Sequence, residues 1–158
     1  LAMLVAQLAE AARRPSWLQR LAVDATDIDE ECLARARAAQ YAVQTYGAPL
    51  APRARPWMRD VPGGELMEVV PEVRERVRFL RHDLGRDAPP EPPYHVIICR
   101  NVVIYFGREV QERLFAGFAD ALAPGGLLLL GKVETLIGPA RERLELVDLR
   151  ERLYRRPA

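Results

Sequence analysis

The sequence predicts an α/β domain built on a largely parallel sheet. Helical and strand-like patterns alternate through most of the 158 residues, which is typical of this class. Two predicted strands, residues 94–99 and 127–130, are nearly or fully apolar, as expected of parallel strands covered on both faces. The length suits one hydrophobic core and is short for two ordinary domains.

The first forty residues predict a helix, a strand and a second helix. Apolar residues recur at helical spacing over residues 1–12. Residues 18–25 contain a short apolar stretch, and we expect a buried strand that ends near Thr26. Asp29 is well placed to cap the following helix, which we expect over residues 30–40.

The composition changes over residues 41–70, where four prolines interrupt the chain. Pro62-Gly63-Gly64 indicates a turn, and residues 65–70 have strand-like content. We therefore expect a small inserted β subdomain over residues 46–70, with a hairpin. Residues 77–80 predict the next strand of the main sheet.

The second half continues the alternation of strands and helices. A strand over 94–99 precedes a helix over 108–122, a Pro-Gly-Gly turn at 124–126 and a strand over 127–130. Residues 141–156 fit a terminal hairpin or a helix, and we favour strands.

Composition excludes several classes of function. There are 23 basic and 22 acidic residues, a balance that argues against a nucleic-acid-binding protein. No apolar run approaches the roughly 20 residues of a membrane helix, so we expect no direct membrane insertion. Two cysteines and two histidines make neither a zinc site nor a disulfide framework. We expect no metal, reduced cysteines and a cytoplasmic location.

Polar residues follow the predicted strands at their carboxyl ends, where open α/β sheets bind ligands. Asp27, Asp83 and the pair Arg100–Asn101 occupy such positions, and we expect them to share one pocket. A carboxylate there can accept hydrogen bonds from both hydroxyls of a ribose. The alternatives stay open: Asp27 as a helix cap or loop carboxylate, Arg100 in a structural ion pair, and Tyr105 as a packing ring.

The octapeptide Cys99–Phe106 resembles the signature of CheR-type chemotaxis receptor methyltransferases. Further segments resemble the same family in order and spacing along the whole chain. They are Ala25–Asp29, Val77–Phe79 with Asp83-Leu84, Leu122–Gly126, Gly131–Glu134 and Leu153–Arg155.

The resemblance implies a Rossmann-like S-adenosylmethionine-dependent methyltransferase sheet with a small antiparallel β insert. It implies methyl-ester formation on cytoplasmic glutamates of chemotaxis receptors, with S-adenosylhomocysteine as the product. It also implies that the insert at residues 46–70 docks a receptor tail peptide.

Site residues follow from the same resemblance. Asp27 matches the carboxylate that holds the adenosine ribose, and Tyr105 matches a tyrosine near the transferred methyl. Arg100 and Tyr105 are the expected catalytic residues. The expected cofactor-binding residues are Asp27, Asp83, Leu84, Arg100 and Asn101.

Three departures from the family pattern matter. Asp83 stands where the family usually has Asn, and Lys132-Val133 replaces a His-Ser pair. The glycine-rich loop and first strand, which would precede Leu1, are missing, so we expect a domain truncated at its start. With a central strand absent, we expect a marginally stable chain that self-associates.

Two other functions remain as alternatives. One is a non-catalytic relative that binds a receptor or partner, which the missing loop would favour. The other is a nicotinamide-dependent dehydrogenase with a similar sheet, although the sequence contains no dinucleotide glycine fingerprint.

Overall fold

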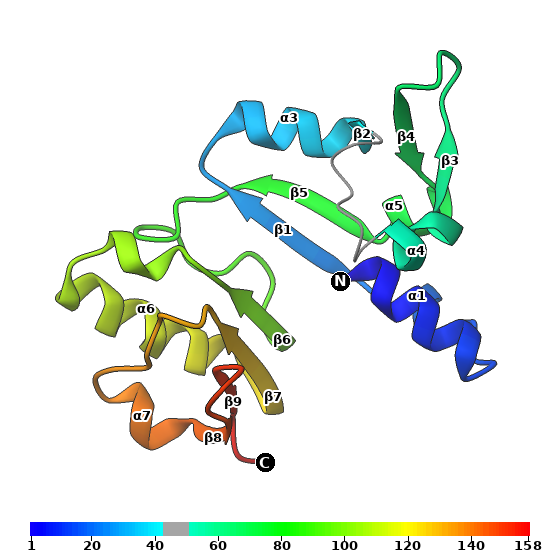
Figure 1. The fold of residues 1–158 in the computed structure, drawn as a ribbon. Coiled ribbons are helices and arrows are strands. Elements are labelled where there is room, and N and C mark those ends of the chain that lie inside the picture. Colours follow the sequence, from blue (N-terminus) through cyan, green and yellow to red (C-terminus); the bar gives the residue numbers. More distant parts are fainter. Residues whose placement is uncertain (43–50) are drawn as a thin grey trace. The chain divides into compact units, whose positions relative to one another are not determined.

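The computed structural model describes residues 1–42 and 51–158, which form two compact units (Figure 1). The first unit is Leu1–Asp83 and the second is Leu84–Ala158. Each contains helices packed against strands, and each has its own hydrophobic core.

The first unit contains a parallel pair of strands, β1 (Val23–Asp27) and β5 (Val77–Arg81). Helix α1 (Ala2–Ala11) confirms the first predicted helix. The predicted strand is confirmed as β1, which ends at Asp27. Residues 18 and 19 belong to the short helix α2 (Ser16–Gln19), and β1 begins at Val23.

Helix α3 (Glu30–Ala38) follows β1 and begins as predicted. The Asp29 side chain caps it by accepting hydrogen bonds from the backbone N–H groups of Glu31 and Cys32, at 2.8 and 3.3 Å. The helix ends earlier than expected because Ala39 adopts a left-handed conformation, with φ of 55°. Gln40 then starts strand β2 (Gln40–Ala42) instead of extending the helix.

The first unit also contains a three-stranded antiparallel sheet in the order β2-β4-β3. The predicted hairpin is confirmed: β3 (Met58–Asp60) pairs with β4 (Leu66–Val69) across a turn in which Gly63 has φ of 107°. Short helices flank this sheet: α4 (Ala51–Ala54), η2 (Arg55–Trp57) and α5 (Pro71–Arg74).

This sheet starts before the expected insert, since β2 pairs with β4. Residues 46–50 of the expected insert lie outside the described residues. The core beneath the sheet is shared with α1. Its buried members are Ala2, Ala6, Ala39, Met58, Met67, Val69 and Val73.

The second unit is a four-stranded mixed sheet in the order β6-β7-β9-β8 (Figure 1). Strands β6 (Tyr94–Cys99) and β7 (Leu122–Leu130) are parallel. Strands β8 (Glu145–Asp148) and β9 (Leu153–Arg155) form an antiparallel hairpin, with β9 against β7. The preference for a terminal hairpin is therefore confirmed, and the helix α7 (Ala140–Arg143) precedes it.

Helix α6 (Arg108–Ala121) connects β6 to β7 and supplies much of the core of the second unit. Phe115 and Phe118 pack edge to face with ring centroids 6.4 Å apart. The largest fully buried side chains of the described residues are Phe115, Leu122, Leu128, Leu130 and Val103, all of this unit.

Two features of the second unit differ in detail from the prediction. Residues 124–126 lie within the bounds of β7, but they have no partners in β6, the register shifts across them and Gly125 has φ of 75°, so the predicted turn appears as an irregularity inside the strand. Within the second unit, strand β6 is covered on one face. Val96 and Ile98 are 43% and 47% exposed, whereas the alternating Ile97 and Cys99 pack into the core.

Candidate functional site

Two of the predicted acidic residues lie at the carboxyl ends of the two parallel strands of the first unit. Asp27 ends β1 and pairs in register with Arg81, the last residue of β5. The backbone N–H of His82 donates to the Asp27 carbonyl at 2.9 Å. Asp83 follows His82, so the two acidic residues lie at or just after the carboxyl ends of parallel neighbours, where α/β sheets bind ligands.

Asp27 does not cap the helix that follows it, because Asp29 does. One oxygen of Asp27, Oδ1, accepts from the backbone N–H of Asp29 at 3.0 Å. Within the described residues its other oxygen accepts no hydrogen bond. The residue is exposed beside a small hollow of about 160 Å³. The hollow is lined by Ala25, Thr26, Asp27, Cys32, Leu33, Ala36 and Phe79.

The other predicted site residues belong to the second unit. Arg100 and Asn101 follow β6 directly and both are exposed. The guanidinium of Arg100 has no ion-pair partner among residues 1–42 and 51–158, so the structural ion pair considered for it is not found. Leu84 is half-buried and packs against the core of this unit.

Tyr105 lies in the short 3-10 helix η3 (Val103–Tyr105) and is 82% exposed. Within the second unit, the Tyr105 ring therefore does not pack into the core. Arg100, Asn101 and Tyr105 thus project from one loop after β6. Asp27 and Asp83 belong to the first unit, and a pocket shared by both groups stays a prediction.

The sequence analysis missed one residue that organises this loop. Glu134 is only 3% exposed, and its carboxylate accepts hydrogen bonds from four backbone N–H groups. Three of these belong to Asn101, Val102 and Val103, and the fourth to Gly131. Its position four residues beyond the apolar end of β7 was the available signal, since a buried carboxylate requires partners.

The environment of Glu134 changes two pKa values. Burial alone would raise the pKa of the Glu134 carboxyl, but hydrogen bonds from four backbone N–H groups outweigh it and lower that pKa. Burial, with a contribution from the Glu134 charge, raises the pKa of the Cys99 thiol to about 12. Cys99 is therefore a neutral core residue and a poor nucleophile at physiological pH.

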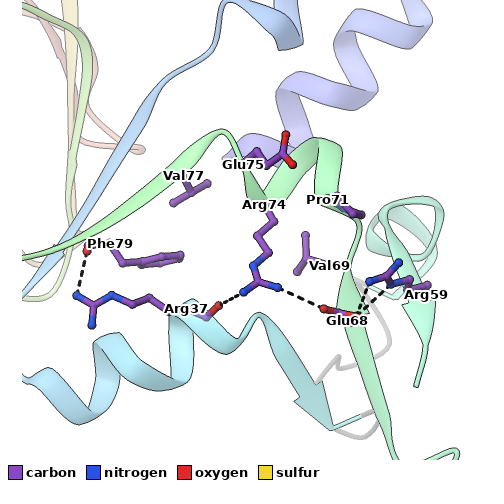
Figure 2. Close-up of a pocket in the computed structure, with 9 residues that line it drawn as sticks. All are labelled: Arg37, Arg59, Glu68, Val69, Pro71, Arg74, Glu75, Val77 and Phe79. Atoms are coloured by element: carbon purple, nitrogen blue, oxygen red, sulfur yellow. Dashed lines mark hydrogen bonds and ion pairs between the residues drawn. The ribbon is translucent and has the colours of Figure 1, made fainter. Parts of the chain in front are cut away.

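A larger groove of about 480 Å³ opens elsewhere on the first unit (Figure 2). Arg59 donates twice to Glu68, at 2.8 and 3.0 Å, and Arg74 donates to the other Glu68 oxygen at 3.3 Å. Arg74 also donates to the Arg37 carbonyl at 2.8 Å, and Arg37 to the Phe79 carbonyl at 3.1 Å.

Apolar side chains lie between these groups, so the groove combines cations with an apolar floor (Figure 2). The three guanidinium side chains remain 44–56% exposed despite their bonds. The lining residues are Arg37, Arg59, Glu68, Val69, Pro71, Arg74, Glu75, Val77 and Phe79.

Neither a metal centre nor a membrane span is found in the part of the chain that the structure describes. No three His, Cys, Asp or Glu side chains of these residues converge to hold a metal ion. None of the helices described is both long enough and apolar enough to cross a bilayer.

The parallel strands with polar residues at their carboxyl ends define a ligand-binding α/β domain. Comparison with known families makes this assignment specific. Residues 1–153 match the family model described as CheR methyltransferase, SAM binding domain. The chain belongs to this family, whose cofactor is S-adenosylmethionine, and the expected resemblance is confirmed.

Individual relatives agree with the family match. The chain is 33% identical over 135 residues to the chemotaxis protein methyltransferase of Vibrio parahaemolyticus, covering 85% of this chain and 49% of that protein. It is 42% identical over 77 residues to the Listeria innocua protein of the same name, 49% of this chain and 29% of that one. The chain thus spans about half the length, or less, of these curated relatives.

One relative is much larger. An uncharacterized 104.1 kDa protein of Rhodobacter capsulatus is 32% identical over 134 residues, which is 85% of this chain and 14% of that protein. Domains similar to this one therefore also occur within long polypeptides.

The residues at the end of β1 fit the adenosyl part of this cofactor. Asp27 offers an oxygen that accepts no hydrogen bond from the described residues, and ribose hydroxyls are donors. The adjacent hollow is mostly apolar, as a flat adenine ring or ribose carbon surface requires.

Proposed function

We propose that this protein transfers the methyl group of S-adenosylmethionine to glutamate side chains of chemotaxis receptors, forming methyl esters. The family match over residues 1–153 carries this proposal. The names of the relatives, chemotaxis protein methyltransferases, support it. Since such glutamates lie on the cytoplasmic part of a receptor, we place the reaction in the cytoplasm.

The proposed reaction requires no general base from the protein. A glutamate carboxylate is already ionised near neutral pH, so no general base is needed to prepare it. The cofactor supplies an activated methyl group on a sulfonium. The protein's task is to align the acceptor oxygen with that group and to exclude water.

The residues after the strands have distinct roles in this proposal. Asp27 accepts hydrogen bonds from the ribose hydroxyls. Asp83 and Leu84 lie beside the adenine, where a carboxylate can accept from the exocyclic amine although it cannot donate. Arg100 and Asn101 line the cofactor site. Arg100 orients the cofactor or acceptor, and Tyr105 lies near the transferred methyl.

The activity is tested with the full-length gene product, methyl-tritiated S-adenosylmethionine and a cytoplasmic receptor fragment. We expect incorporated label that mild alkali releases as methanol, because methyl esters hydrolyse in base. Label that resists alkali would refute ester formation, and absence of cofactor binding would refute the enzyme assignment altogether.

Asp27→Asn should weaken cofactor binding, because the amide replaces one acceptor oxygen and removes the charge. We expect a loss of about 1–3 kcal/mol in binding free energy, measured by calorimetric titration. Glu31→Gln is a matched control, since Glu31 is exposed on α3 and does not line the hollow at Asp27. Equal affinities for wild type and Asp27→Asn would remove Asp27 from the site.

We further propose that the inserted subdomain at residues 46–70 takes a receptor tail peptide, as the family resemblance implies. The arginine-lined groove of Figure 2 supports this, because it borders β3 and β4 of that segment. Half-exposed guanidinium groups over an apolar floor suit a peptide that carries a carboxylate next to an apolar side chain.

Arg59→Ala should weaken binding of a labelled receptor tail peptide, measured by fluorescence anisotropy. We expect a loss of about ten-fold, because a charged hydrogen-bond donor is removed from the groove. Arg108→Ala is the control, since its side chain is 82% exposed on the second unit. Equal losses in both variants would indicate non-specific charge attraction and contradict the proposal.

A further inference from the structure

Glu134 joins the two loops that follow the parallel strands of the second unit. Its Oε1 atom accepts from the N–H groups of Val102 and Val103 at 2.9 and 2.8 Å. Its Oε2 atom accepts from Asn101 at 3.0 Å and from Gly131 at 2.6 Å. One buried carboxylate therefore satisfies four backbone donors from two segments about thirty residues apart in sequence.

The backbone of the first loop is shaped around this carboxylate. Asn101 has a left-handed conformation, with φ of 59°, and the three successive N–H groups of residues 101–103 converge on Glu134. Successive amides arranged in this way form an anion-binding nest. Here the protein's own side chain occupies the nest.

The opposite side of the loop is held as well. Gln111, on α6, donates to the carbonyls of Val103 and Phe106 at 3.1 and 2.8 Å. Gly131 leaves no room for a side chain, because an added Cβ would lie 2.6 Å from both Asn101 Oδ1 and Glu134 Oε2. The loop after β6 is thus fixed by backbone contacts.

These contacts matter because the candidate-site side chains Arg100 and Tyr105 do not anchor the loop, whose Val103 side chain packs into the core. Arg100 has no ion-pair partner in the part of the chain that the structure describes, and the Tyr105 side chain is largely exposed. Their directions therefore depend on the conformation of the backbone that carries them. Glu134 binds three successive amides of that backbone, at residues 101–103, and Gln111 and the buried Val103 hold its other side.

We propose that Glu134 is a positioning residue of the methyltransferase: it preorganises the loop that presents Arg100, Asn101 and Tyr105 to the cofactor. This inference rests on the proposed function. Glu134 itself faces the backbone amides and is not assigned contact with cofactor or acceptor. If the loop is already ordered before the cofactor binds, less of the binding free energy is lost in ordering it.

Glu134→Gln is the sharpest variant because it preserves shape and removes half of the acceptor capacity. Each oxygen of the carboxylate serves two N–H groups. The NH₂ group of glutamine would face one of these pairs as a donor, so two backbone donors lose their acceptor. Gly131→Ala disturbs the same contact from the other side and keeps the charge.

The test compares both variants with wild type in the full-length gene product, well below the melting temperature. We expect the dissociation constant for S-adenosylmethionine to rise about ten-fold or more in each, the equivalent of one charged hydrogen bond. Glu151→Gln is the matched control, because it removes an exposed carboxylate that pairs only loosely with Lys132, at 3.6 Å. Its affinity should equal that of wild type.

A second readout separates positioning from general stability. Hydrogen exchange should accelerate in the amides of residues 101–103 in Glu134→Gln, with the α6 amides unchanged. In wild type, acidification that protonates Glu134 should open the same amides, so this measurement survives a variant that fails to fold. Protection of these amides that is independent of pH would overturn the inference.

The other possible results distinguish the positioning role of Glu134 from a structural role and from failure of the proposed function. Lowered melting temperature with unchanged cofactor affinity in the folded variants would mean a merely structural role and would refute positioning. No cofactor binding by wild type would refute the proposed function, and the inference with it. Wild-type binding with unaltered binding in both variants would refute the inference alone.

Discussion

Individual side chains in this chain acquire their importance from the backbone around them. Arg100 is exposed directly after a strand, and an arginine at that position indicates a candidate site from the sequence alone. Glu134 has no predicted role in the sequence, where it only belongs to a segment that resembles the family, yet it is the carboxylate on which four backbone amides converge. The hydrogen bonds show that Glu134 is more strongly constrained than Arg100.

The lowered pKa of Glu134 predicts a specific dependence of stability on pH. A carboxyl with an unfolded pKa of about 4.3 and a lower folded pKa stabilises the fold above that value. The contribution is lost as pH falls through the lowered folded pKa. Unfolding free energies of wild type and Glu134→Gln, measured in urea, should differ most near pH 7, and the difference should shrink as the pH falls below the unfolded pKa of about 4.3. Parallel curves would contradict this account.

Helix α6 is the element that most strongly organises the second unit. It alternates exposed charged residues with a buried face that includes Leu114, Phe115 and Phe118. That face covers β7, while Gln111 on the same helix holds the loop after β6. One amphipathic helix thus supports both the core and the candidate site.

Phe115→Ala should therefore be among the most damaging single substitutions. Phe115 is fully buried and packs edge to face on Phe118, so truncation leaves a cavity. We expect the free energy of unfolding to fall by about 3–5 kcal/mol, measured by chemical denaturation. Glu109→Ala, exposed on the first turn of the same helix, should change it little. A loss below about 1 kcal/mol for Phe115→Ala would show that the core collapses around the gap.

At the scale of the whole molecule, each unit contains a parallel strand with one pairing edge left open. Among the described residues, β1 pairs with β5 alone and β6 with β7 alone. Strand β6 also exposes Val96 and Ile98. Open edges with exposed apolar residues are templates for pairing with another chain.

The 158-residue chain by itself should self-associate with rising concentration. Sedimentation velocity over a range of concentrations measures this directly. Replacing Val96 and Ile98 together with lysine should shift the population toward monomer, since charges on an edge strand oppose pairing. Leu149→Lys, in the exposed turn between β8 and β9, is the control. A monomeric wild type at all concentrations would contradict this prediction.

Most of the local structure could be predicted from the sequence. Apolar residues at helical spacing predicted α1 and α6. Asp29 predicted the start of α3, and Pro62-Gly63-Gly64 predicted the turn of the hairpin. These signals are local, because they depend on side-chain periodicity, capping and turn conformation within a few residues. The octapeptide at Cys99 likewise identified the family that the comparison confirms.

Only the tertiary structure decided where pairing overrides local preference. Gln40 leaves a helical pattern because, as the first residue of β2, it pairs with Glu68 of β4. The register of β7 against β6 shifts across the Pro-Gly-Gly segment. The face of β6 that packs into the core of the second unit and the convergence of four amides on Glu134 have the same origin. Such features arise from contacts between residues distant in sequence, and a local pattern contains no information about which distant residue will provide the partner.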